Sequence, residues 1–349
     1  MRVVVTGASG NVGTAVLRAL SSSDRVTSVV GVARRPPDAP PPGTAGVEWV
    51  SADVTTSDLT LVFAGADAVI HLAWLIQPSH HPQQMHTVNV VGTRRVAEAV
   101  VSAGVPSLVH ASSVGAYSPR TSTDLVGEDY PHDGIASSHY SRDKAQCEAL
   151  LDVFELEHPE IRVARLRPAL IFQGSAGSEI TRYFFGRFLP TRLVRPEVLP
   201  FLPLPRGLLL QSVHSDDVAD AYLRVVTSDD ARGAYNVAAQ PPLDTAAIAA
   251  VFGSRPLTVP AAALRGLLAA SWHLHLQPTD GGWLDMGMQA PLLSTARISA
   301  LGWAPRTAPG DALRELVQGI QARTGGGTPV LARLPSLGSR LLGQDRRTG

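Results

Sequence analysis

The sequence predicts an α/β protein with a doubly wound parallel sheet and a smaller, mostly C-terminal lobe that binds a substrate. Short apolar segments rich in β-branched residues alternate with segments whose apolar residues recur at helical spacing. A glycine-rich turn, Thr6 to Gly13, joins the first predicted strand to the first predicted helix. The 349 residues are 44% hydrophobic and 17% charged, which is enough to bury a large core and argues against global disorder.

The predicted elements follow one another in an order typical of βαβ units. Strands are expected at 3–5, 26–33, 47–50, 68–72, 107–111, 162–166 and 235–237, and helices at about 12–20, 85–103 and 140–154. Residues 36–46 form a Pro-rich surface loop, and 213–226 are expected to form a strand followed by a helix. Strands that alternate with helices indicate a Rossmann-type sheet.

The glycine-rich turn has the composition of a phosphate cradle. Gly7 permits a tight turn, Gly10 lets a pyrophosphate approach the backbone, and Gly13 lets the helix pack closely on the sheet. The start of the following helix offers free N–H groups and a partial positive charge to an anion. The spacing Gly-x-x-Gly-x-x-Gly therefore predicts a dinucleotide site, and the alternative is a tight turn without a ligand.

The residues after the second strand indicate which dinucleotide binds. An acidic residue there accepts hydrogen bonds from the ribose of NAD, whereas Arg suits the 2′-phosphate of NADP. This chain has Ala33, Arg34 and Arg35 and no acid. NADP is therefore the expected cofactor and NAD the alternative; the other interpretation is that both arginines are only solvated.

These features suggest how the chain is divided. Residues 1–168, with 211–237 returning to them, are expected to form the NAD(P)-binding Rossmann domain. Residues 169–210 and 238–322 are expected to form the substrate-binding lobe. The Gly-, Pro- and Arg-rich stretch 323–349 is expected to be a flexible tail.

Lys144 is the only lysine of the chain, and it follows Tyr140 by four residues. On a helix this spacing places both side chains on one face. There an ammonium is expected to stabilise a phenolate and to lower the pKa of Tyr140, so that the phenol exchanges protons near neutral pH. The alternative is an exposed tyrosine beside a solvated lysine.

Composition excludes several classes of function. Lys and Arg number 30 and so do Asp and Glu, which removes the bulk electrostatic argument for nucleic acid. The single cysteine, Cys147, excludes an intramolecular disulfide. His80, His81 and His86 cluster without a carboxylate at metal spacing, so no metal site is expected. With no signal peptide and no apolar run of membrane-spanning length, a cytoplasmic protein without a membrane partner is expected.

Together these motifs resemble the extended branch of the short-chain dehydrogenase/reductase superfamily, also called the NAD-dependent epimerase/dehydratase family. Besides the glycine-rich turn and the Tyr140–Lys144 pair, the matching segments are Asp53-Val54, His71-Leu72-Ala73, Asn89 with Gly92-Thr93, 112–117, Arg167-Pro168, 213–219 and 301–305. The resemblance extends over about residues 1–320. It is highly specific for the family and weakly specific for the substrate.

The resemblance implies roles for individual residues. Tyr140 is expected to be the acid or base, Lys144 to hold the nicotinamide ribose as well, and Ser113 to hydrogen-bond the substrate oxygen. The cofactor performs the hydride step, and the protein orients it. The residues expected to contact the cofactor are Gly7, Ser9, Gly10, Asn11, Val12, Gly13, Arg34, Arg35, Asp53, Val54, Leu72, Ala73, Asn89, Tyr140, Lys144 and Pro168.

Departures from the family pattern narrow the reaction. Val114 and Gly115 stand where the family's sugar dehydratases carry an Asp-Glu pair. Leu210 stands where many sugar-nucleotide epimerases carry an Arg that grips the diphosphate, and Arg206 is out of register. The expected lobe segment also holds Tyr183, Phe184, Phe185, Phe188, Leu189 and Phe201. This apolar wall favours an apolar carbonyl or alcohol, although Arg182, Arg187, Arg192 and Arg195 leave room for an anion.

The first interpretation is therefore an NADP-dependent oxidoreductase acting on a small, rather apolar molecule. The alternatives are an NAD-dependent sugar-nucleotide epimerase and a non-catalytic NADP-binding sensor or scaffold. By analogy with the family, the helices at 85–103 and 136–154 are expected to form a homodimer.

Overall fold

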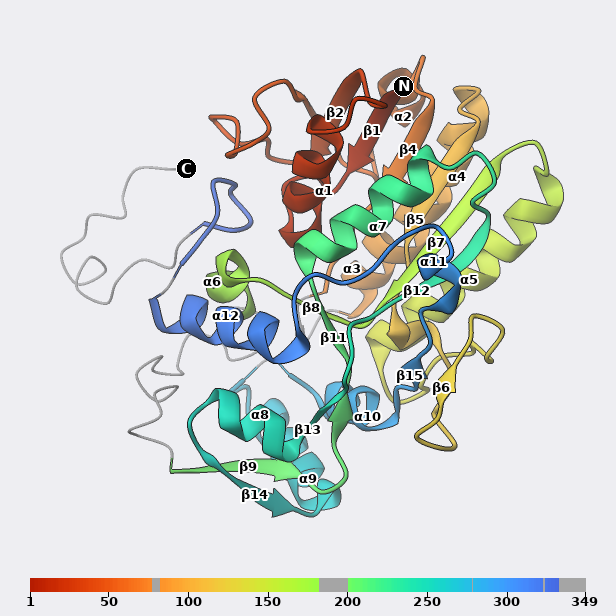
Figure 1. Cartoon of the computed structure of the whole chain (residues 1–349). Helices are drawn as coiled ribbons and strands as arrows, with labels where there is room; N and C mark the ends of the chain where they lie inside the picture. Colours follow the sequence, from red (N-terminus) through yellow and green to blue (C-terminus); the bar gives the residue numbers. More distant parts are fainter. Residues whose placement is uncertain (77–81, 182–199, 278, 323, 333–349) are drawn as a thin grey trace.

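The computed structural model describes residues 1–76, 82–181, 200–277, 279–322 and 324–332, and a seven-stranded parallel sheet forms its centre (Figure 1). In spatial order the strands are β12 (Gly233–Val237), β7 (Arg162–Pro168), β5 (Ser107–Ala111), β4 (Ala68–His71), β1 (Arg2–Thr6), β2 (Ser28–Ala33) and β3 (Glu48–Ser51). Strand order reverses at β1, and open α/β sheets bind ligands beside such a reversal, at the carboxyl ends of the strands. The doubly wound parallel sheet that the sequence predicts is confirmed.

Helices cover both faces of this sheet because strand side chains alternate between them. Val3 and Val5 of β1 pack in the layer under α1 (Asn11–Ser21) and α7 (Ser215–Thr227). Val4, between them, packs in the opposite layer. That second layer is completed by α2 (Leu59–Phe63), α4 (Gly92–Ser102) and α5 (His139–Glu157) (Figure 1).

The helix expected at 85–103 is three consecutive pieces. They are α3 (Pro82–His86), a π-helical turn η1 (Thr87–Val91) and α4. The wider turn carries Asn89, whose amide donates to the backbone oxygen of Leu75 and accepts from its nitrogen. The π turn therefore allows a helix side chain to bind the segment that follows β4.

Most of the remaining elements lie below the sheet in Figure 1. Strand β9 (Phe201–Pro205) pairs with β14 (Arg255–Val259), β10 (Leu209–Leu210) with β13 (Leu243–Asp244), β8 (Leu170–Phe172) with β11 (Ser212–His214), and β6 (Leu125–Val126) with β15 (Leu292–Leu293). The helices are α6 (Gly177–Ile180), α8 (Thr245–Val251), α9 (Ala261–His273), α10 (Gly281–Gln289), α11 (Ala296–Ser299) and α12 (Pro309–Ala322), with 3₁₀ turns η2 (Val114–Ala116) and η3 (Gly174–Ala176).

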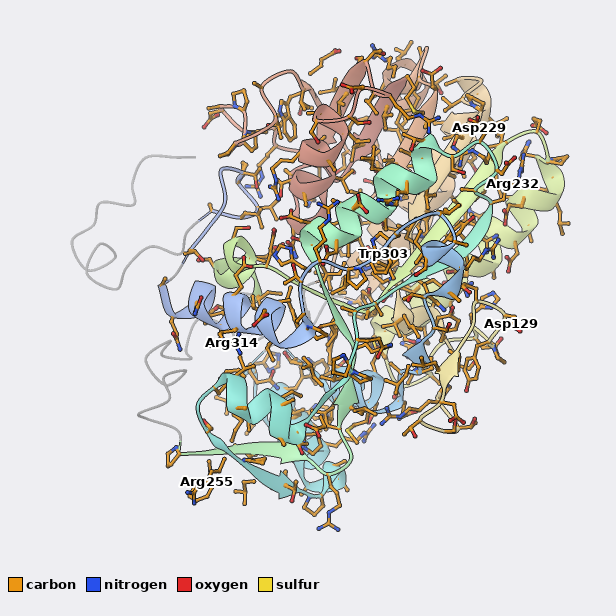
Figure 2. All side chains as sticks on the ribbon, in the orientation of Figure 1. Asp129, Asp229, Arg232, Arg255, Trp303 and Arg314 are labelled. Atoms are coloured by element: carbon orange, nitrogen blue, oxygen red, sulfur yellow. The ribbon has the colours of Figure 1, made fainter. Side chains whose placement is uncertain are left out.

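Ile298 and Trp303, which belong to the predicted lobe, pack instead in the core of the sheet domain. Trp303 is 1% exposed and lies in the interior of the molecule (Figure 2). Its Nε1 donates to the backbone oxygen of Asp217 on α7 at 2.8 Å. The division into a Rossmann domain and a substrate lobe stays a prediction.

The stretch predicted as a flexible tail is packed where it is described. Thr328 is 3% exposed, and its hydroxyl donates to the backbone oxygen of Ser9 at 2.7 Å. Leu331 is 1% exposed, and Gly327 lies against Pro41. Residues 324–332 therefore differ from the prediction because they find partners on the glycine-rich turn; 333–349 lie outside the described residues. No helix in the described ranges is long and apolar enough to span a bilayer.

Candidate active site

Ser113 and Tyr140 meet at the carboxyl edge of the sheet. Ser113 follows β5 and caps η2, where its Oγ accepts from the backbone nitrogen of Gly115 at 3.0 Å. Tyr140 lies in the first turn of α5, whose N-terminus is capped by Ser138. The Ser113 side chain lies near enough to the Tyr140 hydroxyl to lower its pKa, and both side chains are buried.

Lys144 lies one turn further along α5 and is 2% exposed. Its Nζ donates to the backbone oxygen of Ala111 at the end of β5, at 2.6 Å. The ammonium is 5.8 Å from the centroid of the Tyr140 ring. The predicted trio of Ser113, Tyr140 and Lys144 therefore converges on one point of the fold.

The predicted pKa of Tyr140 is wrong for this geometry. Burial raises the pKa of Tyr140 to about 12, and the hydrogen bond from Ser113 opposes this rise only in part. Lys144 does not lower the pKa of Tyr140. Its ammonium donates to the Ala111 carbonyl and lies over the ring of Trp74. Tyr140 is thus a protonated phenol at neutral pH, which is the form that donates a proton.

Aromatic and apolar side chains surround the Tyr140 ring. Trp74 meets it edge-on with ring centroids 5.9 Å apart, and Trp283 of α10 lies on it at 5.3 Å. Ile76, Ile135 and Met286 complete this cluster. An apolar wall is therefore present, but it comes from segments other than the predicted one.

The predicted wall in the lobe is not part of this site where it is described. Phe201 begins β9 and is 53% exposed. Tyr183, Phe184, Phe185, Phe188, Leu189 and the four arginines of 182–195 lie outside the described residues. The sequence signal for the observed wall was weak: Trp74 directly follows the His71-Leu72-Ala73 segment, but nothing local links Trp283 or Met286 to Tyr140.

Gly115 packs directly against the ring of Tyr140. A Cβ atom at this position would lie 2.8 Å from Cε1 of Tyr140 and 3.1 Å from Sδ of Met286. A carboxylate side chain at Gly115 would therefore displace the Tyr140 ring. This close packing agrees with the sequence argument against a sugar dehydratase.

The three glycines of the turn have different physical roles. Gly7 has φ +71°, and a Cβ there would lie 2.5 Å from the backbone nitrogen of Ala73. A Cβ at Gly13 would lie 2.4 Å from the oxygen of Gly7. A Cβ at Gly10 would meet only that oxygen, at 3.4 Å. The fold itself requires Gly7 and Gly13, whereas Gly10 leaves space that a bound group can use.

The start of α1 is suited to an anion. Gly10 is its N-cap residue and provides no side-chain hydrogen bond to the first turn. Asn11 and Val12, the first residues of the helix, are half-buried, and Ser9 is buried. The free N–H groups of this eleven-residue helix fit a pyrophosphate.

Arg34 and Arg35 follow β2 and are exposed. Arg34 lies close enough to Asp53 to contribute to the lowered pKa of its carboxyl, where burial acts against the hydrogen bonds from Thr55. Val54 follows Asp53 and lies beside Gly92 of α4, where a Cβ would approach it to 2.9 Å. This edge of the site therefore presents arginine side chains to solvent next to the glycine-rich turn.

The remaining predicted contacts lie at the same edge of the sheet. Leu72 and Ala73 lie directly against Gly7, and Pro168 ends β7 opposite Val237 of β12. Asn89 uses its side chain to hold Leu75 and Asp143. The structure thus brings the predicted residues around one edge, although their contact with a cofactor stays a prediction.

Sequence reasoning missed Gln173, a buried residue that connects the glycine-rich turn to α7. Its amide donates to the side chain of Asn11, and its Oε1 accepts from Ser215 at 2.6 Å. No motif indicates this role, because the contacts join segments 42 and 162 residues apart.

Other candidates lie away from the site. In the described ranges no group of three or more His, Cys, Asp or Glu side chains has a geometry that would hold a metal, and the expectation of no metal stays a prediction. His80 and His81 lie outside those ranges; His86 contacts Asp143 at 3.0 Å.

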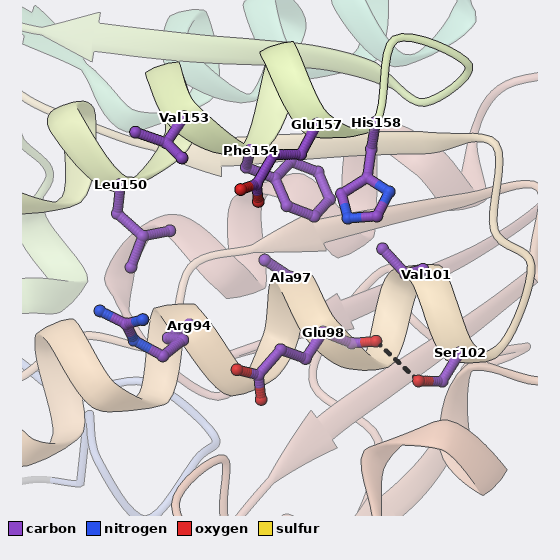
Figure 3. A pocket seen from close by; sticks show the side chains of 10 residues that line it. All are labelled: Arg94, Ala97, Glu98, Val101, Ser102, Leu150, Val153, Phe154, Glu157 and His158. Atoms are coloured by element: carbon purple, nitrogen blue, oxygen red, sulfur yellow. Dashed lines mark hydrogen bonds between the residues drawn. The ribbon is translucent and has the colours of Figure 1, made fainter.

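A groove between α4 and α5 is lined by Arg94, Ala97, Glu98, Val101, Ser102, Leu150, Val153, Phe154, Glu157 and His158 (Figure 3). Its α5 side lies about 9 Å or more along the helix from Lys144, so it is a surface groove and not the catalytic pocket.

Comparisons with known proteins agree with this fold. The model of the NAD dependent epimerase/dehydratase family matches residues 3–238. Human 3 beta-hydroxysteroid dehydrogenase type 7 is 33% identical over 159 residues, 42% of each protein. UDP-glucose 4-epimerase of Mycolicibacterium smegmatis is 31% identical over 180 residues, 49% of this chain and 56% of that one. The chain thus spans about half the length of these relatives.

A solved structure resembles nearly the whole chain. UDP-glucose-4-epimerase from Stenotrophomonas maltophila, with bound NAD and formylated UDP-arabinopyranose, has a TM-score of 0.69. The match covers 92% of this chain and 98% of that one at 20% identity. At this identity the likeness bears on the fold alone.

Proposed function

Since the chain belongs to the NAD-dependent epimerase/dehydratase family, we propose that it transfers hydride between NADP and a carbonyl or alcohol of a small, rather apolar substrate. The observation that carries the proposal is the convergence of the buried Ser113, Tyr140 and Lys144 side chains at the carboxyl edge of the sheet. In the reduction of a carbonyl, the substrate oxygen must accept a proton, and the hydroxyls of Ser113 and Tyr140 can bind that oxygen and supply the proton.

The chain's own residues divide the work of carbonyl reduction. Ser113 donates a hydrogen bond to the substrate oxygen and fixes its direction. Tyr140, protonated at neutral pH, gives its proton to the oxygen as negative charge develops there. Lys144, one turn further along α5, is expected to hold the nicotinamide ribose. NADPH, when bound, supplies the hydride.

The geometry of the glycine-rich turn supports a dinucleotide in this role. The space at Gly10 and the uncapped start of α1 fit the pyrophosphate. Arg34 and Arg35 are exposed at the end of β2 and suit a 2′-phosphate, which favours NADP over NAD.

The apolar cluster around Tyr140 supports a substrate with little charge. Trp74 and Trp283 contact the tyrosine ring, and Met286 packs beside it. Such a wall stabilises an apolar ring or chain and gives nothing to a diphosphate.

A Tyr140→Phe variant tests the proposal. Wild-type protein is screened for NADPH oxidation with fused-ring ketones, aromatic ketones, aliphatic aldehydes and UDP-sugars. With the best substrate, the variant is expected to lose about 10²-fold or more of kcat. Tyr130→Phe is the matched control, because that hydroxyl bonds the Pro119 backbone away from the trio. Full turnover by Tyr140→Phe would remove the phenol from the mechanism.

The second candidate is an NAD-dependent epimerase acting on a sugar nucleotide. The similarity to the epimerase of M. smegmatis favours it. Leu210, half-buried in β10, opposes it, because the family position for a diphosphate-binding arginine is apolar here. Conversion of UDP-glucose by protein that retains NAD through purification would establish this candidate; free release of cofactor would count against it. A sensor without catalysis is the third reading, and the buried trio argues against it.

Homodimer formation through α4 and α5 also stays a proposal. The groove between these helices carries Val153 at 53% exposure beside the charged Arg94 and Glu98 (Figure 3). Analytical ultracentrifugation of the wild type and of Val153→Glu tests it: the variant is expected to be monomeric. A cytoplasmic location is likewise proposed.

A further inference from the structure

Trp74 covers the ammonium of the single lysine. Nζ of Lys144 lies 3.3 Å from the centroid of the Trp74 ring. The same indole meets the ring of Tyr140 edge-on, with centroids 5.9 Å apart. One side chain at the end of the segment after β4 therefore contacts both members of the pair on α5.

Ring contacts, and not a hydrogen bond, hold the indole of Trp74 in this position. Its Nε1 is buried and has no hydrogen-bond partner among the described residues. A buried donor without a partner opposes this placement, so other contacts must favour it. The ring–ammonium contact is one of these, since Trp is the aromatic side chain that attracts a cation most strongly.

The contact with Trp74 affects the protonation of Lys144. Burial lowers the pKa of Lys144 to about 7, although Asp143 and Glu148 favour the charged form. An indole face attracts an ammonium and gives no comparable attraction to a neutral amine. Trp74 therefore shifts the balance toward the charged form, in the same direction as the two carboxylates.

The other groups around the ammonium do not replace this effect. Those that face it are Tyr140, Asp143, Cys147 and Glu148 on α5, His71 on β4, and His110 and the Ala111 carbonyl on β5. Burial lowers the pKa of His71 to about 3 and that of His110 well below its usual value, so both are neutral at pH 7. Burial raises the pKa of Cys147 to about 11, so its thiol is neutral as well.

We propose that Trp74 is a positioning residue that keeps the charged form of Lys144 fixed beside Tyr140 through its indole face. The importance of this role for catalysis rests on the proposed function. The contact between Trp74 and Lys144 is independent of it. Trp74 acts through Lys144. This role is separate from its part in the apolar wall around Tyr140, for which any bulky apolar side chain would be enough.

The lone lysine makes the test specific. Protein grown with lysine labelled with ¹³C at Cε gives a single side-chain resonance, whose shift follows the protonation of Lys144. In Trp74→Leu the midpoint of this titration is expected to fall by about one pH unit, and in Trp74→Phe by less. Trp283→Leu is the matched control, since Trp283 contacts Tyr140 from α10, and its midpoint is expected to stay at the wild-type value.

The readout separates this inference from the enzyme assignment. With a substrate in hand, the basic limb of the pH profile of kcat/KM is expected to shift downward with the lysine midpoint. If no carbonyl compound is turned over, the proposed function fails, and the titration still decides the role of Trp74. An unchanged midpoint in folded Trp74→Leu overturns the inference. Should that variant not fold, Trp74→Phe decides: a lower midpoint supports the inference, and the wild-type midpoint overturns it.

Discussion

Glu148 and Arg167 form a two-pronged ion pair beneath the active site, with Nε 2.8 Å from Oε1 and Nη2 2.9 Å from Oε2. Both side chains are almost fully buried, at 0% and 2% exposure. Glu148 also accepts from Ser112, the residue before Ser113, and from Arg165 on β7. The pair therefore ties α5, which carries Tyr140 and Lys144, to β7 and to the residue that precedes Ser113.

Replacing Glu148 by Gln is expected to destabilise the protein by roughly 3 kcal/mol at pH 7, because the buried Arg167 loses its counter-charge and Arg165 keeps only Asp152 and Glu155. Burial alone would raise the pKa of Glu148, but the hydrogen bond and charge of Arg167 and the charge of Arg165 hold it well below the usual range. Such a carboxylate stabilises the fold above its unfolded pKa near 4.5 and loses this contribution as the pH falls. Urea denaturation between pH 7 and 3 measures both effects.

In the variant, the dependence of stability on pH is expected to be flatter below about pH 4.5 than in the wild type. Glu98→Gln on the exposed face of α4 is the control and should change the free energy of unfolding by less than about 0.5 kcal/mol. Equal stability of Glu148→Gln and Glu98→Gln would show that the buried pair has no net role.

The glycine-rich turn allows binding and folding to be separated. Gly10→Ala is expected to fold with a free energy of unfolding within about 1 kcal/mol of wild type, because its new methyl group meets only the Gly7 oxygen at 3.4 Å. The same methyl group occupies space proposed for the pyrophosphate, so the affinity for NADPH is expected to fall at least tenfold. Fluorescence titration with NADPH and thermal denaturation measure the two quantities.

Gly13→Ala provides the opposite case. Its methyl group would lie 2.4 Å from the Gly7 oxygen, so the variant is expected to lose stability by several kcal/mol. If Gly10→Ala binds NADPH as the wild type does, the dinucleotide does not approach the turn at this position.

Cofactor preference depends on the arginines after β2. Arg34→Ala is expected to weaken NADPH binding by about tenfold and to leave NADH binding nearly unchanged, because only NADPH carries the 2′-phosphate. Titration of both cofactors, with the exposed Arg94→Ala of α4 as control, measures the difference. Identical curves for NADPH and NADH in the wild-type protein would contradict the assignment.

The sheet and the glycine-rich turn could be predicted because their signals are local. The strands β1, β2 and β4 contain short apolar runs, and Gly7, Gly10 and Gly13 lie within seven residues of sequence. Tyr140 and Lys144 were found for the same reason, since they share a helix face. Ser113 was identified from the resemblance of residues 112–117 to the family. The division of the helix at 85–103 was not predicted, because the π turn depends on the contact of Asn89 with Leu75. Apart from β11, α7 and β12, the short strands and the helices after β7 were not predicted either.

The environment of the catalytic residues could not be predicted, because it depends on contacts between distant segments. Trp283 and Met286 reach Tyr140 from α10, and no sequence pattern connects α10 with α5. The pKa of Tyr140 was mispredicted for this reason: burial by those side chains outweighs the effect expected from Lys144. Likewise, Thr328 packs on Ser9 across more than three hundred residues.

The contact between Thr328 and Ser9 tests whether the C-terminal segment stabilises the cofactor turn. Thr328→Val keeps the shape of the side chain but removes the hydroxyl, which leaves the Ser9 oxygen without its 2.7 Å donor. A buried carbonyl that loses its partner costs roughly 1–3 kcal/mol, so the melting temperature is expected to drop by several degrees. Thr121→Val, at an exposed position, is the control and should melt as the wild type does.

Because Ser9 lies in the turn proposed to hold the pyrophosphate, NADPH is also expected to bind more weakly to Thr328→Val. Equal melting temperatures and equal NADPH affinities in Thr328→Val and wild type would mean that residues 324–332 rest on the turn without stabilising it.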